Sequence, residues 1–188
     1  MACRPVTHAA TVATVATIMA ITHAATPAPE GGQSPPIVPI VAVTVLKPLL
    51  PAPAGWTKGS IEADRAVLSD TCSYTFAYAI YTKDTTSVRV TVADTGSDPG
   101  SLAVLATMVV TFPDDYVGQI PPATTVTRLM FKGSPAATLW DSAKSEGELT
   151  VVVGGRFVAK AEGSRLDSLD TLRAIVDQID LKALSALK

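Results

Sequence analysis

The sequence predicts an α+β domain: an antiparallel sheet built from hairpins, with one short mid-chain helix and a C-terminal helix packed on the sheet. Two observations carry this prediction. Apolar residues alternate with period two in several segments after residue 70, and they recur at the helical period near the C-terminus. A chain of 188 residues with 47% hydrophobic side chains is long enough to bury one core.

The first residues have the features of a targeting segment. Arg4 precedes an uncharged, apolar run over residues 9–21, which is too short to span a bilayer as a helix. We therefore expect residues 1–25 to be a signal peptide and the protein to be exported, to the periplasm or the medium. A disordered tail on a cytosolic protein is the alternative.

A linker and then the domain follow. Residues 26–39 are rich in Pro and Gly and predict a linker, so that residues 40–188 form a single domain. Residues 40–46 suit either a short strand or an extended strip along the domain. Trp56 ends a proline-rich stretch, and we expect it to anchor the start of the folded domain.

The first hairpin spans residues 71–81 and 87–94, joined by a polar turn. In its second strand, valines at 88, 90 and 92 are expected to face the core. In its first strand the large residues occupy even positions, which predicts that they face the core and that the small odd-numbered residues face solvent. The even-numbered residues are Cys72, Tyr74, Phe76, Tyr78 and Ile80.

The middle of the chain predicts a helix and then more hairpins. Residues 100–112 show helical spacing with Ser101 as N-cap, although their Val-rich end also suits a strand. Strands are expected at 125–132, 136–143, 148–154 and 156–163, with Gly154 and Gly155 forming a two-residue turn. In the last strand we expect Phe157, Ala159 and Ala161 to face the core, and Arg156, Lys160 and Glu162 to face water.

A C-terminal helix is predicted from a stripe of apolar residues. Leu169, Leu172, Val176 and Ile179 recur at helical spacing, and Asp167 is the expected N-cap. This stripe is expected to pack on the sheet.

Three stretches carry a resemblance to known proteins: "LLPAPAGW", the hairpin ending in "VTVAD", and the sequence from "GELTVVVGGRFVAKAEG" to "LRAIVDQIDLKAL". Together they resemble exported bacterial domains of unknown function, and the element order resembles PsbP-like sandwiches, in which an antiparallel sheet carries helices. The likeness covers residues 49–187. It implies an accessory or interaction role and assigns no functional residue to this chain.

Several chemistries are excluded by composition. The net charge is −2, and no basic run is interleaved with aromatics, so nucleic acid is not expected as a partner. Both histidines, His8 and His23, lie in the predicted signal peptide, which leaves no histidine for a catalytic triad or a His-rich metal site. Phosphate-loop and dinucleotide motifs are missing. We expect no cofactor and no metal.

Carboxylates are the remaining polar candidates. Asp94 and Asp98 lie four apart in a Gly-rich loop that resembles a calcium loop, but Leu105 occupies the place of the bidentate Glu, which favours a plain turn. Asp114 and Asp115 form a possible acid pair. Glu146 and Glu148 flank Gly147 in an expected turn. Acid pairs catalyse only where burial or crowding separates their pKa values.

Aromatic residues are the other candidates. Trp56, Trp140 and Tyr78 are candidates for an apolar ligand site. Core filling is the preferred interpretation, because it already accounts for alternate aromatics on one strand face.

These observations predict an exported, non-catalytic binding or accessory domain, whose partner is another protein or a small apolar ligand. A carrier of a small apolar ligand is the alternative, and a carboxylate-dependent hydrolase is a third.

Overall fold

The computed structural model describes residues 38–69, 72–96, 98–110 and 123–187. Five helical segments accompany eight strands in this part of the chain. The helical segments are α1 (Val43–Leu46), η1 (Lys47–Leu49), α2 (Pro99–Val110), α3 (Asp170–Val176) and α4 (Leu181–Ser185). The strands are β1 (Thr57–Lys58), β2 (Glu62–Ser69), β3 (Cys72–Lys83), β4 (Thr86–Asp94), β5 (Thr124–Phe131), β6 (Ser134–Asp141), β7 (Glu146–Val153) and β8 (Phe157–Ser164).

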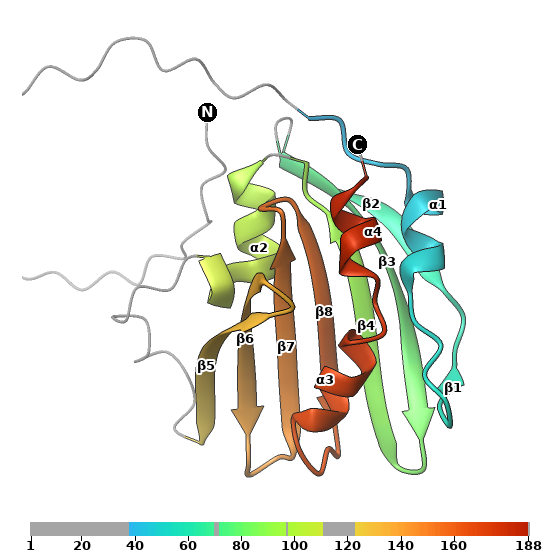
Figure 1. Cartoon of the computed structure of the whole chain (residues 1–188), viewed down its shortest axis with the longest axis vertical. Coiled ribbons are helices and arrows are strands. Elements are labelled where there is room, and N and C mark those ends of the chain that lie inside the picture. Colours follow the sequence, from blue (N-terminus) through green and yellow to red (C-terminus); the bar gives the residue numbers. More distant parts are fainter. Residues whose placement is uncertain (1–37, 70–71, 97, 111–122, 188) are drawn as a thin grey trace, which may run out of the picture.

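The strands form one antiparallel sheet in the order β1-β3-β4-β8-β7-β6-β5, and β2 pairs with β3 beside β1 (Figure 1). The predicted α+β class, the mid-chain helix and the helical C-terminus are confirmed. The turn at Gly154 and Gly155 is confirmed as well, since both residues have positive φ, 61° and 65°.

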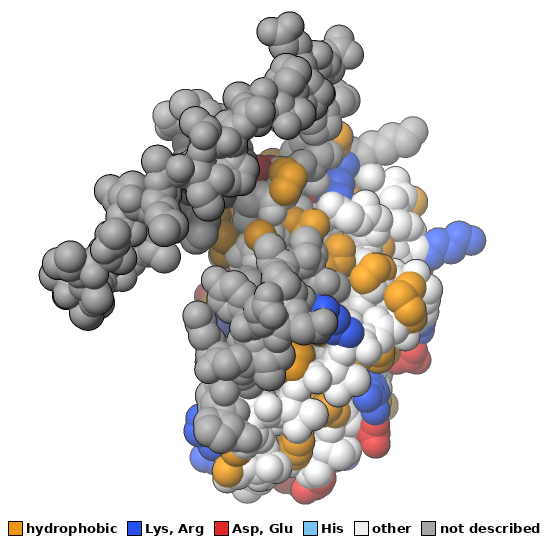
Figure 2. All heavy atoms as spheres, turned by 90° about the vertical axis from the view of Figure 1, so that its left-hand side faces the viewer, with side chains coloured by type: hydrophobic (Ala, Val, Ile, Leu, Met, Phe, Trp, Pro, Cys, Tyr) orange, Lys and Arg blue, Asp and Glu red, His pale blue; other side chains and the backbone are white. Residues whose placement is uncertain are grey.

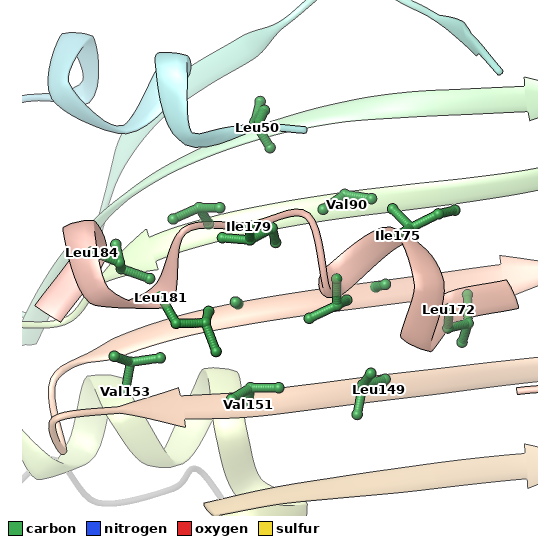
Figure 3. Packing of buried hydrophobic residues seen from close by; sticks show 14 of the residues in the cluster. Leu50, Val90, Leu149, Val151, Val153, Leu172, Ile175, Ile179, Leu181 and Leu184 are labelled. Atoms are coloured by element: carbon green, nitrogen blue, oxygen red, sulfur yellow. The ribbon is translucent and has the colours of Figure 1, made fainter. Parts of the chain in front are cut away.

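One face of the sheet, called here the helix face, carries the main core. Figure 1 shows α1, α3 and α4 in front of this face, and Figure 3 shows leucines and isoleucines of α3, α4 and the link between them directed onto valines and leucines of the strands. The core cluster combines Leu172, Ile175 and Leu184 from the helices with Val90 and Val151 from the sheet, all at most 1% exposed. Burying such a side chain stabilises the fold by about 1.5–3 kcal/mol.

The opposite face, called here the open face, is covered only in part by the described elements. Helix α2 packs on one end of it, where Leu102 and Ala106 contact Ala93, Val152 and Val158. These strand residues neighbour helix-face residues in sequence and therefore point the other way. The rest of the open face is the surface considered below.

The predicted orientation of β3 was wrong for most of its even-numbered residues, although Cys72 is buried as expected, at 1% exposed. Ala77 and Ala79 are fully buried on the helix face, whereas the even-numbered aromatics lie on the open face and Ile80 is 40% exposed. The register explains this outcome, because Ala77 pairs with Val92 and the fully buried valines of β4 fix which face is covered. Small side chains suit that face because the entry segment, residues 38–56, and the helices approach it closely.

Other elements differ from their predictions. Residues 40–46 contain helix α1 in place of a strand, and β2 was missed because charges interrupt its apolar pattern.

The helix ends also differ from their predictions. The expected single C-terminal helix is two short helices, with Asp180 capping the second through a hydrogen bond from the Ala183 amide. Asp98 accepts a bond from the Ser101 amide and caps α2, while the α3 cap position is Leu169 and not Asp167.

A pair of glycines lets the C-terminal region approach the sheet. Gly147 and Gly163 lie opposite each other on β7 and β8. A Cβ at Gly163 would stand 3.0 Å from both methyl groups of Leu166 and 3.1 Å from one of Leu172. Because the two glycines have no side chains, they leave a depression in the surface of the sheet, and these leucines fill it.

Tyr81 links the entry segment to the sheet. Its ring is fully buried, and its hydroxyl donates a hydrogen bond to the Pro51 carbonyl at 2.7 Å. Burial raises the pKa of Tyr81 to about 12, against an ordinary value of about 10.

This shift predicts a loss of stability at high pH. The unfolded chain releases the Tyr81 proton near pH 10 and the folded chain only near pH 12, so the contribution is complete below pH 10 and is lost as pH rises to 12. We expect urea unfolding to show a loss of about 1 kcal/mol from this group between pH 9 and pH 11. Tyr81→Phe should lack this loss, and equal losses in the two proteins would contradict the assignment.

None of the helices in the described ranges has the length and apolar character needed to cross a bilayer.

Candidate functional site

The open face contains a hollow of about 580 Å³ at the end away from α2. Its floor is built from two neighbouring cross-strand rows, which the register brings together from six neighbouring strands of the sheet. The first row is Ile80, Arg89, Glu162, Glu148 and Leu139. The second row contains Ser87, Ser164, Glu146 and Asp141, with Thr124 from β5 beside Asp141 and Lys144 from the following loop at the rim.

A salt-bridge network borders the hollow and includes two of the glutamates that line it. Lys160 Nζ lies 3.0 Å from Glu148 Oε2 and 2.9 Å from Glu162 Oε1, and Thr150 donates a hydrogen bond of 2.7 Å to Glu148. Burial lowers the pKa of Lys160, but the two glutamates outweigh it and raise the pKa overall. Lys160 is therefore held in its charged form, which disfavours a role as a general base or nucleophile.

An aromatic row runs along β3 toward this hollow. Ring centroids are 5.9 Å apart for Tyr74 and Phe76 and 6.2 Å apart for Phe76 and Tyr78. The Arg89 guanidinium lies 4.8 Å from the Tyr78 ring centroid, a cation–π distance. The Tyr78 hydroxyl donates to Glu62 on the neighbouring strand, and this hydrogen bond raises the pKa of Tyr78.

The three aromatic candidates do not form one site. Trp56 and Trp140 are partly buried and pack against the core of the helix face, where Trp140 lies over Gly147. Tyr78 is on the opposite face of the sheet. The two tryptophans therefore pack with the core of the helix face, and Tyr78 lies in the aromatic row of the open face.

Asp94 has a structural role. It is fully buried, and Arg156 contacts both of its oxygens at 2.7 Å. The expectation that Arg156 faces water was wrong, because this ion pair draws the guanidinium to the end of the sheet. Asp98 is occupied as the helix cap described above, so these two carboxylates form no joint site.

The other carboxylate candidates have different outcomes. Asp114 and Asp115 lie outside the described residues. Glu146 and Glu148 are in strand β7 and not in a turn, and both line the hollow. No group of three or more His, Cys, Asp or Glu side chains that could hold a metal occurs among the residues that the structure describes.

Sequence reasoning missed Arg89, Lys160 and Glu162 as members of a site, because strand alternation predicts only that their side chains face solvent. A usable signal was present: once the turn at Gly154 is placed, Glu148 faces Glu162 across the hairpin and Lys160 lies diagonal to Glu148 on the same face of the sheet. Comparisons with protein family models, curated proteins and solved structures found no match for this chain.

Proposed function

We propose that this chain is an exported, non-catalytic binding domain, and that a protein partner binds the open face of its sheet. The observation that carries the proposal is the aromatic row of β3, which stays partly exposed on the open face and continues into the charged hollow. Tyrosine, arginine and phenylalanine together are the side chains enriched at the centres of protein interfaces.

The alternatives find less support in the geometry. A carrier of a small apolar ligand needs a largely apolar pocket, whereas six of the thirteen residues that line the hollow are charged. A carboxylate-dependent hydrolase needs a carboxyl group that carries a proton to the leaving group. Glu148 and Glu162 instead share one ammonium group in a salt-bridge network.

Site-specific photo-crosslinking tests the proposal. Benzoylphenylalanine at position 78 should give a discrete protein adduct in producing cells, whereas the same group at the exposed Lys182 of helix α4 should give none. Mass spectrometry of the adduct also reports whether the chain has been cleaved near residue 25, as export through a signal peptide requires.

A charge variant makes the test specific for the open face. Arg89→Glu removes the cation over Tyr78 and places a carboxylate beside Glu162, so we expect the adduct to decrease several-fold. Lys144→Glu at the rim should have a smaller effect, and Arg173→Glu on α3 should have none. Equal adducts from positions 78 and 182, or no response to Arg89→Glu, would contradict the proposal.

A further inference from the structure

The two edges of the sheet are protected to different degrees against pairing with strands of other chains. The edge at β2 carries Glu62, Asp64 and Arg65, and a register shift between Val67 and Ser69 interrupts its pairing. Charges and bulges of this kind prevent edge strands from pairing with other chains. Strand β5, at the other edge, is less protected: it pairs with β6 over its whole length without a register shift, and it contains a single charged residue, Arg128.

The hydrogen-bonding groups of β5 that point outward follow from its hairpin. Lys132 and Gly133 form a two-residue turn with positive φ at both positions, and Phe131 pairs with Ser134 across it. Such a turn is closed by a hydrogen-bonded pair, and these pairs alternate along an antiparallel ladder. The odd-numbered residues of β5 therefore bond to β6. The backbone N–H and C=O groups that point away from β6 are those of Thr124, Val126, Arg128 and Met130.

We propose that β5 pairs with β5 of a second copy of this chain, antiparallel and centred on Thr127, so that two sheets join into one. In this register Thr124 faces Met130 of the second copy and Val126 faces its Arg128. All outward-pointing residues thus find a partner. A shift by two residues in either direction leaves one outward-pointing residue of each strand unpaired.

Charge and side-chain chemistry favour the same register. Centring the pair on Arg128 would place two guanidinium groups directly opposite each other, which is unfavourable. Centring it on Thr127 places each Arg128 beside a valine and pairs the two threonines, a favourable cross-strand combination. Met130, which is 64% exposed, gains a neighbour from the second copy. Figure 2 shows this side of the molecule, where hydrophobic side chains are scattered over an otherwise mostly uncharged described surface.

A twofold axis through Thr127 is consistent with the commonest symmetry of soluble homodimers. It also keeps the helix faces of both copies on one side of the joined sheet, and both open faces on the other. The aromatic row of the binding surface proposed above remains accessible, since β3 lies far from β5 in the strand order.

Analytical ultracentrifugation of the full chain and disulfide trapping test the proposal together. We expect a concentration-dependent monomer–dimer equilibrium. In Thr127→Cys the two Cα atoms lie about 4.5 Å apart across a non-hydrogen-bonded pair, which is within disulfide range. Thr125→Cys is the matched control, because its two copies are offset by four residues, about 14 Å along the strand. Both threonines are exposed, so neither change disturbs the core.

The expected product is a dimer joined through position 127, identified by mass spectrometry, with little or none through position 125. Thr127→Glu should weaken dimerisation about tenfold by opposing two carboxylates, and Thr85→Glu in the distant β3–β4 turn should leave it unchanged. A chain that stays monomeric at every concentration would overturn the second-copy proposal and point instead to an extended segment of another protein. Equal trapping at 125 and 127 would overturn the register and with it the proposal.

Discussion

Asp94→Ala is expected to destabilise the fold by about 3–5 kcal/mol, because removing one partner of a buried ion pair leaves an uncompensated charge. Asp94 accepts two hydrogen bonds from Arg156, each of 2.7 Å, and one each from the amides of Val41 and Gly96, at 2.7 and 2.8 Å. The Asp94 side chain is fully buried and that of Arg156 is 12% exposed, so water cannot replace these bonds without opening the end of the sheet.

The same substitution should release the entry segment. Arg156 also donates to the Pro39 carbonyl, and Thr75 donates to the Val41 carbonyl. These contacts hold the start of the domain against the ends of β4 and β8. We therefore expect hydrogen exchange at Val41 and Leu46 to become faster in Asp94→Ala than global unfolding alone would explain.

Urea unfolding with a matched surface pair provides the control. Asp170 pairs with Arg173 at 2.9 Å, but their side chains are 79% and 44% exposed, so Asp170→Ala should cost no more than about 0.5 kcal/mol. A loss below about 1 kcal/mol in Asp94→Ala, the range of ordinary surface changes, would show that the pair does not hold the segment.

Leu172→Ala is the second large effect, with an expected loss of about 2–5 kcal/mol. The side chain is fully buried between α3 and the glycine depression on β7 and β8. Truncation leaves a cavity there, because neighbouring strands cannot close over it. Val67→Ala, a truncation at a residue that is 66% exposed, is expected to change stability by no more than about 0.5 kcal/mol.

Gly163→Ala provides a coupled test of the same contact. Alone it should destabilise by about 1–3 kcal/mol through overpacking against Leu166 and Leu172. When Gly163→Ala is combined with Leu172→Ala, the new methyl group occupies part of the cavity left by the leucine. The loss of stability of the double variant should therefore be about 1 kcal/mol smaller than the sum of the two single losses. Additive losses would mean that the glycine does not accommodate Leu172.

Much of the candidate site could not be predicted from single strands. Alternation in β4 and β8 correctly separated Val90 and Ala159 from Arg89 and Lys160, because in these strands one face is apolar and the other polar. Residues 72–81 carry aromatics on one face and small residues on the other, and both faces are compatible with burial. Because the aromatics are larger, the sequence predicted that they face the main core. In the structure the alanines face it, because the helices pack closely on that side of the sheet.

The sequence by itself determined the local structure: the antiparallel hairpins, the turn at Gly154 and Gly155, and the helical C-terminus. These features depend on period, turn chemistry and neighbours in the chain, all of which are readable locally. Only the tertiary structure decided which face of β3 is covered, that Asp94 and Arg156 form a buried pair 62 residues apart, and that Arg89, Glu148 and Glu162 share one hollow. Strand order brings these groups together, and strand order is set by packing between distant segments, which no local pattern encodes.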